Sequence, residues 1–272
     1  MEAKLITFIT DFGHKDPFVG VIKGVILGIN PSVGIIDLTH GIPPQDILAG
    51  ALVLRYSAPF FPQGTIHIAV VDPGVGTKRK PLLIESESSF YIGPDNGILS
   101  LALKGKKTGR IIELANQTYH LKRTSATFHA RDIFAPIAGY LSLGIPPEDL
   151  GVMLKDYERL HCPRVSKKGH ALQGEIIYID GFGNLITNIH ERDLQGLEPD
   201  NVSVSLGNLT INNLAPNYAS AGEGGYVALI NSWGLLEISI FKGNAYLQCG
   251  AAIGEKVYVQ EGKGVDAIYN EG

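Results

Sequence analysis

Cysteine is scarce in this chain, with two residues among 272, and Cys162 and Cys249 lie far apart in the sequence. A zinc knuckle or a redox-active pair needs cysteines at close spacing, so the sequence favours neither. We therefore interpret both as structural thiols. His, Cys and acidic residues also form no cluster at metal-ligand spacing, and we expect no metal site.

A basic surface and a long apolar run are missing too. The net charge is -4 with a pI near 6.1, and the Lys and Arg clusters are short, such as those at 104–107 and 167–168. Nucleic-acid binding needs clustered basic residues, so we expect no such partner. No segment approaches the roughly 20 apolar residues of a membrane span, and the N-terminus shows no signal-peptide pattern. We expect a cytoplasmic protein that does not bind membranes.

The common nucleotide motifs are absent or incomplete. Gly74-Val75-Gly76 lacks the third glycine of a dinucleotide fingerprint, and no Gly-Lys-Ser/Thr phosphate loop occurs. Asp11-Phe12-Gly13 matches the metal-binding triplet of protein kinases, but no His-Arg-Asp catalytic loop accompanies it. The sequence thus gives no support to nicotinamide or nucleotide-triphosphate chemistry.

Apolar strands and amphipathic helices alternate through the first half of the chain, at residues 4–10, 18–29, 33–38, 47–54 and 65–71. This alternation predicts an α/β domain with three layers and a mostly parallel sheet, which strands at 82–85 and 90–93 extend. Pro17 suits the first turn of the first helix, and Asp16 is its expected cap.

The pattern changes near residue 165, after a stretch of linker composition. Short strands with alternating patterning follow, at residues 175–179, 185–189, 202–206, 226–230, 235–240 and 256–259. We predict an α/β domain over 1–164 and a smaller all-β barrel domain over 165–272. A ligand would bind between the two domains.

The stretch Val70–Arg79 carries the strongest chemical signal. An apolar strand ends at Asp72, and Gly74 and Gly76 permit a tight turn that can bring Arg79 back toward the carboxylate. Ligands of open α/β sheets bind beyond the carboxyl ends of the strands, where Asp11 follows the first strand in the same way. The alternative is an ordinary turn with a surface ion pair.

Two further stretches are candidates. His129 directly precedes an apolar helix that runs through Leu143, and this position should lower the pKa of the imidazole through the helix dipole. A structural, hydrogen-bonded histidine is the alternative. Asp180, Phe182 and Asn184 form an exposed acid, aromatic and amide set in a predicted hairpin turn, which could equally be a turn that binds nothing.

Several motifs, in this order, resemble those of one family. They are Thr10-Asp11-Phe12-Gly13 with Asp16, Val71–Thr77 with Arg79, Pro94-Asp95-Asn96-Gly97, Phe128–Asp132, Asp180–Asn184 and Asn231-Ser232-Trp233-Gly234. The family is that of the S-adenosylmethionine hydroxide adenosyltransferases, the adenosine-forming S-adenosylmethionine hydrolases, which are relatives of fluorinase and chlorinase. The resemblance covers essentially the whole chain.

The resemblance implies hydrolysis of S-adenosylmethionine to adenosine and methionine, without cofactor, by a homotrimer with sites between subunits. Asp72, Arg79 and His129 would hold the water or hydroxide that attacks C5′ of the ribose. The family also implies a set of substrate-binding residues. Asp11 would bind the ribose hydroxyls, Phe182 and Tyr218 the adenine faces, Asn184 the adenine edge, and Asp16, Asp180 and Ser232 the methionine ammonium group.

Two positions depart from the halogenating relatives. Trp233 stands where those enzymes carry an arginine for the methionine carboxylate, and Ala130 stands where fluorinase has a serine. The sequence therefore favours water over halide as the nucleophile. A chlorinase-like adenosyl transfer and a non-catalytic module that binds adenosine or S-adenosylmethionine are the alternatives.

Overall fold

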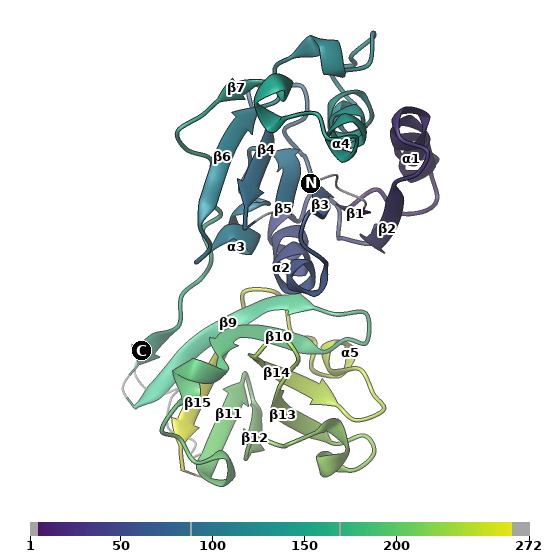
Figure 1. Ribbon diagram of the computed structural model, residues 1–272. Helices are drawn as coiled ribbons and strands as arrows, with labels where there is room; N and C mark the ends of the chain where they lie inside the picture. Colours follow the sequence, from purple (N-terminus) through teal and green to yellow (C-terminus); the bar gives the residue numbers. More distant parts are fainter. Residues whose placement is uncertain (1–4, 88, 169, 263–272) are drawn as a thin grey trace. The chain divides into compact units, whose positions relative to one another are not determined.

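The computed structural model describes residues 5–87, 89–168 and 170–262, and the chain folds into two compact units, Met1–His161 and Cys162–Gly272 (Figure 1). Each unit has an apolar core of its own. Phe8, Ile68 and Phe134 are fully or almost fully buried in the first core, and Leu185 and Ile238 are fully buried in the second.

The first unit contains a sheet of seven strands in the order β2-β1-β3-β5-β4-β6-β7. The strands are β1 (Leu5–Thr10), β2 (Gly34–Thr39), β3 (Ile66–Val70), β4 (Pro81–Ser86), β5 (Ser89–Pro94), β6 (Thr108–Glu113) and β7 (Val152–Met153). β2, β1, β3 and β5 run parallel, whereas β4, β6 and β7 pair antiparallel with their neighbours.

The sheet is therefore mixed, and the prediction of a mostly parallel sheet is confirmed only in part. The reason lies in the connection from β4, which ends at Ser86, to β5, which begins at Ser89. A parallel pair needs a crossover of a dozen or more residues, so this short connection produces a hairpin.

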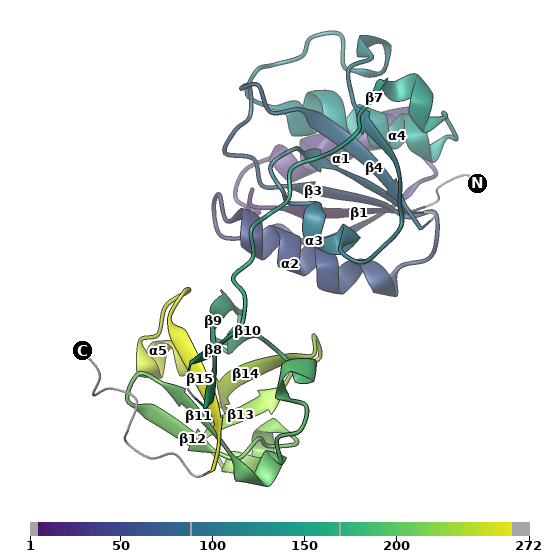
Figure 2. The ribbon, with the colours of Figure 1, turned by 90° about the vertical axis from the view of Figure 1, so that its left-hand side faces the viewer.

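In the described part of the first unit, the α-helices are α1 (Phe18–Ile29), α2 (Ile47–Ser57), α3 (Ser100–Leu103) and α4 (Ala135–Ser142). α1 and α4 pack on one side of the sheet, and α2 and α3 pack together on the other (Figure 2). The expected cap of α1 is wrong. Pro17 is the N-cap residue and no side chain caps it, because Asp16 lies one position too early and is exposed.

The second unit is a nearly closed, antiparallel, barrel-like sheet in the order β12-β11-β15-β9-β10-β14-β13, with β8 paired to β9. Its strands are β8 (Ser166–Lys168), β9 (Ala171–Ile179), β10 (Leu185–His190), β11 (Val202–Leu206), β12 (Leu209–Asn212), β13 (Tyr226–Ile230), β14 (Leu235–Ile240) and β15 (Lys256–Glu261). One short helix, α5 (Ala245–Cys249), packs on β14. The all-β character predicted for this half is confirmed.

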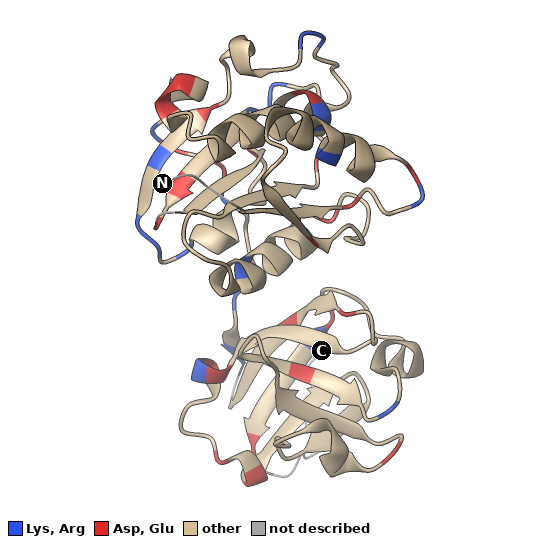
Figure 3. Ribbon diagram, turned by 45° about the vertical axis from the view of Figure 1, so that its right-hand side comes forward, with Lys and Arg blue, Asp and Glu red and all other residues tan. Residues whose placement is uncertain are grey.

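Lys and Arg occur as short, separated segments in both units, with Asp and Glu between them (Figure 3). Among the described residues, every helix is too short or too polar to cross a membrane.

Candidate active site

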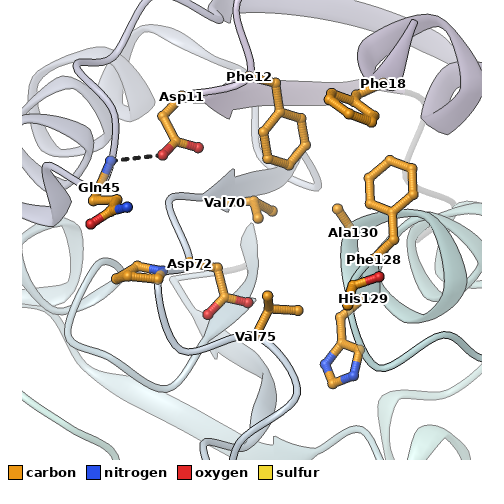
Figure 4. A pocket seen from close by; sticks show the side chains of 12 residues that line it. Asp11, Phe12, Phe18, Gln45, Val70, Asp72, Val75, Phe128, His129 and Ala130 are labelled. Atoms are coloured by element: carbon orange, nitrogen blue, oxygen red, sulfur yellow. Dashed lines mark hydrogen bonds between the residues drawn. The ribbon is translucent and has the colours of Figure 1, made fainter. Parts of the chain in front are cut away.

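Neighbouring parallel strands bring Asp11 and Asp72 to one edge of the sheet. β1 and β3 are paired in register, with Thr10 opposite Val70, so both carboxylates follow their strands at the same end. A cavity of about 610 Å³ opens there. It is lined by Asp11, Phe12, Phe18, Gln45, Val70, Asp72, Pro73, Val75, Thr127, Phe128, His129 and Ala130 (Figure 4).

Asp72, Arg79 and His129 form one hydrogen-bonded network. Arg79 Nε donates to Asp72 Oδ1 at 3.0 Å, and Arg79 Nη2 donates both to Asp72 Oδ2 and, at 2.9 Å, to His129 Nδ1. The side chains of Arg79 and Asp72 are only 8% and 6% exposed. The alternative of a weak surface ion pair therefore does not apply, since the pair is bidentate and buried.

The tautomer of His129 follows from this contact. A guanidinium group can only donate, so Nδ1 must accept and the proton of the neutral imidazole lies on Nε2. Burial lowers the pKa of His129 below its ordinary value, the positive charge of Arg79 lowers it further, and Asp72 acts in the opposite direction. The predicted direction is thus confirmed, but burial is its largest cause rather than the helix dipole.

The loop that carries Asp72 and Arg79 approaches the segment before His129 closely, backbone to backbone. Gly76 has a φ of 77°, and a Cβ at this position would lie 2.3 Å from the carbonyl oxygen of Ala126. Only glycine allows the loop of Asp72 and Arg79 to pack so tightly against the segment that leads to His129. His129 is half-buried and directly precedes a short π-helix, η3 (Ala130–Phe134), which continues into α4.

The rest of the cavity wall divides into a polar and an aromatic side (Figure 4). Asp11 Oδ2 accepts the backbone N–H of Gln45 at 2.9 Å, and the other carboxylate oxygen points into the cavity. Phe12, Phe18 and Phe128 contact one another, with ring centroids 5.3 to 6.2 Å apart. These rings give the cavity an apolar wall opposite its carboxylates.

The prediction missed these wall residues, although two signals were available. Phe12 and Phe128 directly adjoin Asp11 and His129 in the sequence, so they had to lie near the site. Gln45 has no such signal, because its place depends on a left-handed backbone, with a φ of 67°, after Pro43-Pro44. Asp16, by contrast, is exposed and does not line the cavity.

The predicted residues of the second unit form two groups. In the turn between β9 and β10, Asp180 Oδ1 accepts the backbone N–H groups of Phe182 and Asn184, both at 2.9 Å, and Oδ2 accepts Asn184 Nδ2 at 2.8 Å. Asp180 and Asn184 thus hold the turn, and the ring of Phe182 is left 78% exposed. An exposed aromatic ring on a rigid turn can stack on a flat ligand.

The second group surrounds a carboxylate that the prediction overlooked. Glu237 of β14 is 2% exposed, and it accepts hydrogen bonds from Tyr218 Oη at 2.9 Å, Ser239 Oγ at 2.6 Å and Asn231 Nδ2 at 3.0 Å. Burial and the adjacent Glu237 raise the pKa of Tyr218 to about 12. Ser232 is exposed in the turn that Asn231 begins.

Within residues 5–87, 89–168 and 170–262, no three His, Cys, Asp or Glu side chains are placed to hold one metal ion.

Known proteins resemble the chain over nearly its full length. Residues 6–151 match the SAM hydroxide adenosyltransferase N-terminal domain, and residues 174–258 match the C-terminal domain of the same family. An (R)-S-adenosyl-L-methionine hydrolase from Thermus thermophilus is 35% identical, over 88% of this chain and 93% of its own length. A fluorinase from Actinoplanes sp. is 31% identical, over 86% and 90%. The crystal structure of an uncharacterized conserved protein from Thermotoga maritima is 34% identical and superimposes with a TM-score of 0.88, covering 94% of this chain and all of that one.

Proposed function

The chain belongs to the SAM hydroxide adenosyltransferase family, and we propose that it hydrolyses S-adenosyl-L-methionine to adenosine and L-methionine. The observation that carries this proposal is the buried network of Asp72, Arg79 and His129 at the edge of the cavity. A site that only bound a nucleoside would have no use for a charged cluster that can polarise water.

The chemistry requires activation of the nucleophile more than of the leaving group. Water forms a bond to C5′ of the ribose while the bond from C5′ to the sulfonium sulfur breaks. Methionine departs as a neutral thioether, so no acid is needed to protonate it. The remaining task is to hold one water in line with the breaking bond and to take one of its protons.

We propose that Asp72 takes this proton. Of the three side chains, Arg79 only donates, and His129 Nδ1 is already engaged by Arg79. The Asp72 carboxylate has acceptor capacity beyond its two bonds to Arg79. The Nε2–H of His129 is then a donor to the incoming oxygen.

The substrate contacts proposed from the family resemblance differ in their structural support. Asp11 fits a role at the ribose, since one of its oxygens points into the cavity. Phe182 has the exposure that stacking on adenine requires, and Tyr218 is 42% exposed. The other contacts are proposals that rest on the resemblance alone. They place Asn184 at the adenine edge, and Asp16, Asp180 and Ser232 at the methionine ammonium group.

A homotrimer with sites between subunits is likewise a proposal from the resemblance. Light scattering of the purified protein gives the mass of the assembly. Mixing then tests shared sites at S-adenosylmethionine concentrations well below KM, where Asp72→Asn and Phe182→Ala are each less active than wild type. The two proteins should regain activity after they are unfolded together and refolded. No regain in a mixed assembly would show that each site uses one chain only.

The reaction itself is tested by incubating the protein with S-adenosylmethionine in ¹⁸O-water, with and without chloride. We expect adenosine labelled at the 5′ oxygen, unlabelled methionine, and the same rate after treatment with EDTA. Formation of 5′-chloro-5′-deoxyadenosine would instead indicate a chlorinase. That outcome is disfavoured because Ala130 offers no hydroxyl at the position where fluorinase has a serine. Tight binding of S-adenosylmethionine without any product would identify a binding module.

A further inference from the structure

One turn holds both ends of the loop that carries Asp72 and Arg79. The turn comprises Pro94–Gly97, at the end of β5. Asn96 Nδ2 donates to the carbonyl oxygen of Val71 at 2.8 Å, directly before Asp72. The backbone N–H of Asp95 donates to the carbonyl oxygen of Lys80 at 2.8 Å, directly after Arg79. The loop is therefore fixed at the residue before its acid and at the residue after its base.

The bond from Asn96 meets a need that the sheet leaves open. The register of β3 with β1 ends at Val70, and Val71 is completely buried. A buried carbonyl group without a hydrogen-bond partner is costly, so the donor from Asn96 stabilises this particular loop geometry. An aspartate of the same shape would present a carboxylate oxygen to the carbonyl oxygen and would break the contact.

The turn is itself rigid. Asn96 Oδ1 accepts the backbone N–H of Ile98 at 3.2 Å, and the N–H of Asn96 donates to Pro94 at 3.0 Å. Gly97 has a φ of 92°, and a Cβ there would lie 2.9 Å from the backbone nitrogen of Leu160. Because the turn is bonded internally and packed from outside, it can hold the loop without moving with it.

We propose that Asn96 is a positioning residue, which sets the distance of the Asp72 and Arg79 loop from His129. This inference rests on the proposed function. Asn96 is not among the residues that line the cavity, and it acts through the carbonyl group of Val71. A displacement of about 1 Å in such a loop is enough to lower turnover about 100-fold, because the attacking water must be aligned with the breaking bond.

The test compares Asn96 with an asparagine of the same bonding pattern elsewhere in the unit. Asn116 Nδ2 donates to the carbonyl oxygen of Asp149 at 2.6 Å, and Asn116 Oδ1 accepts the N–H of Thr118 at 3.1 Å. Both asparagines are half-buried. Asn116→Asp therefore removes the same type of structural bond at a site outside the loop of Asp72 and Arg79.

We expect Asn96→Asp and Asn96→Ala to lower kcat about 100-fold with KM changed less than about threefold, and Asn116→Asp to leave both constants near wild type. A second readout does not depend on turnover. In Asn96→Ala, the pKa of His129 measured by NMR should rise toward its ordinary value of about 6.5, because Arg79 is no longer held beside it.

The two readouts separate this inference from the proposed function. If the wild-type protein forms no adenosine, the proposed reaction fails, but the NMR measurement still decides on the positioning role. Folded Asn96 variants with unchanged kcat and an unchanged His129 pKa would overturn it. So would variants that fail to fold under conditions in which Asn116→Asp folds, since Asn96 would then serve the fold alone.

Discussion

Asp72 in the first unit and Glu237 in the second are both buried carboxylates near proposed ligand-binding residues, but their hydrogen-bond partners differ in charge. Asp72 in the first unit is held by the guanidinium group of Arg79, which in turn contacts His129. Glu237 in the second unit is held by neutral donors, the hydroxyls of Tyr218 and Ser239 and an amide. The first carboxylate lines a cavity, whereas the second is almost fully buried, on the face of β14 opposite the core residues Leu236 and Ile238.

The charge of the hydrogen-bond partners indicates what each carboxylate can do. A carboxylate that is paired with a fixed cation keeps acceptor capacity for a reacting water and stays in place while charge moves. A carboxylate whose oxygens are satisfied by several neutral donors ties distant chain segments together, and its removal leaves those donors unpaired. We infer that Asp72 serves the chemistry and that Glu237 serves the shape of the second unit.

The largest expected effect comes from Asp72→Asn. The amide keeps the shape but cannot accept a proton, so turnover should fall roughly 10²- to 10⁴-fold while S-adenosylmethionine still binds. Single-turnover kinetics and calorimetric titration measure the two quantities. The matched control is Asp156→Asn, which breaks the exposed pair of Asp156 with Arg159 and should leave turnover unchanged. A fully active Asp72→Asn enzyme would refute the role given to this carboxylate.

Acidification should inactivate the network of Asp72, Arg79 and His129. Protonated His129 can no longer accept from Arg79, and two cations would then face each other. Because the pKa of His129 is lowered in the folded protein, kcat/KM should stay flat down to pH of about 6.5 and fall only below it, by up to about tenfold per pH unit.

The lowered pKa of His129 also makes the free energy of unfolding depend on pH in a defined direction. The unfolded chain binds the proton of His129 at a higher pH than the folded chain does. Stability is therefore lost as the pH falls from about 6.5 through the folded pKa, and it is unaffected above this window. An acid limb of activity centred above pH 7 would contradict the neutral Nε2–H tautomer.

Glu237→Gln should affect stability rather than turnover. The glutamine amide would face the Asn231 amide donor to donor, so we expect a loss of about 1–3 kcal/mol in the free energy of unfolding. The pKa of Tyr218 should fall from about 12 toward its ordinary value of about 10, because the adjacent negative charge is gone. Urea unfolding measures the first effect. Ultraviolet titration, compared with that of Tyr218→Phe, measures the second.

The smallest effect is expected at Phe182, on the exposed side of the second unit. Phe182→Ala should change the free energy of unfolding by less than about 0.5 kcal/mol, since the ring is 78% exposed. If the ring stacks on adenine, KM should rise about tenfold. Phe60→Ala, which removes a ring that is 85% exposed in the first unit, is the control and should leave KM unchanged.

Local patterns predicted much of the fold and part of the site. The strand that ends before Asp72 and the glycines after it predicted the return of Arg79, and the structure confirms that contact. His129 lies 50 positions further along, and only the family resemblance connected it to the pair. Asp16 was expected to cap α1, but the helix begins with Pro17 at the cap. The strand at 82–85 was predicted and corresponds to β4, but its antiparallel direction was not, because strand direction depends on connections, which composition does not reveal. The strands β6 and β7 were not predicted.

The sequence by itself determined where the carboxylates stand along the chain. Strand ends, turns and glycines depend on neighbours within a few residues, so Asp11, Asp72 and Asp180 could be assigned to loop positions. Only the tertiary structure decided what each acid contacts. The sequence shows Glu237 as one more residue of an apolar strand. Its three partners, however, come from the 3-10 helix that begins at Tyr218, from the turn at Asn231 and from β14 itself. Charge compensation, burial and the tautomer of His129 arise from packing between distant segments, and no local pattern encodes them.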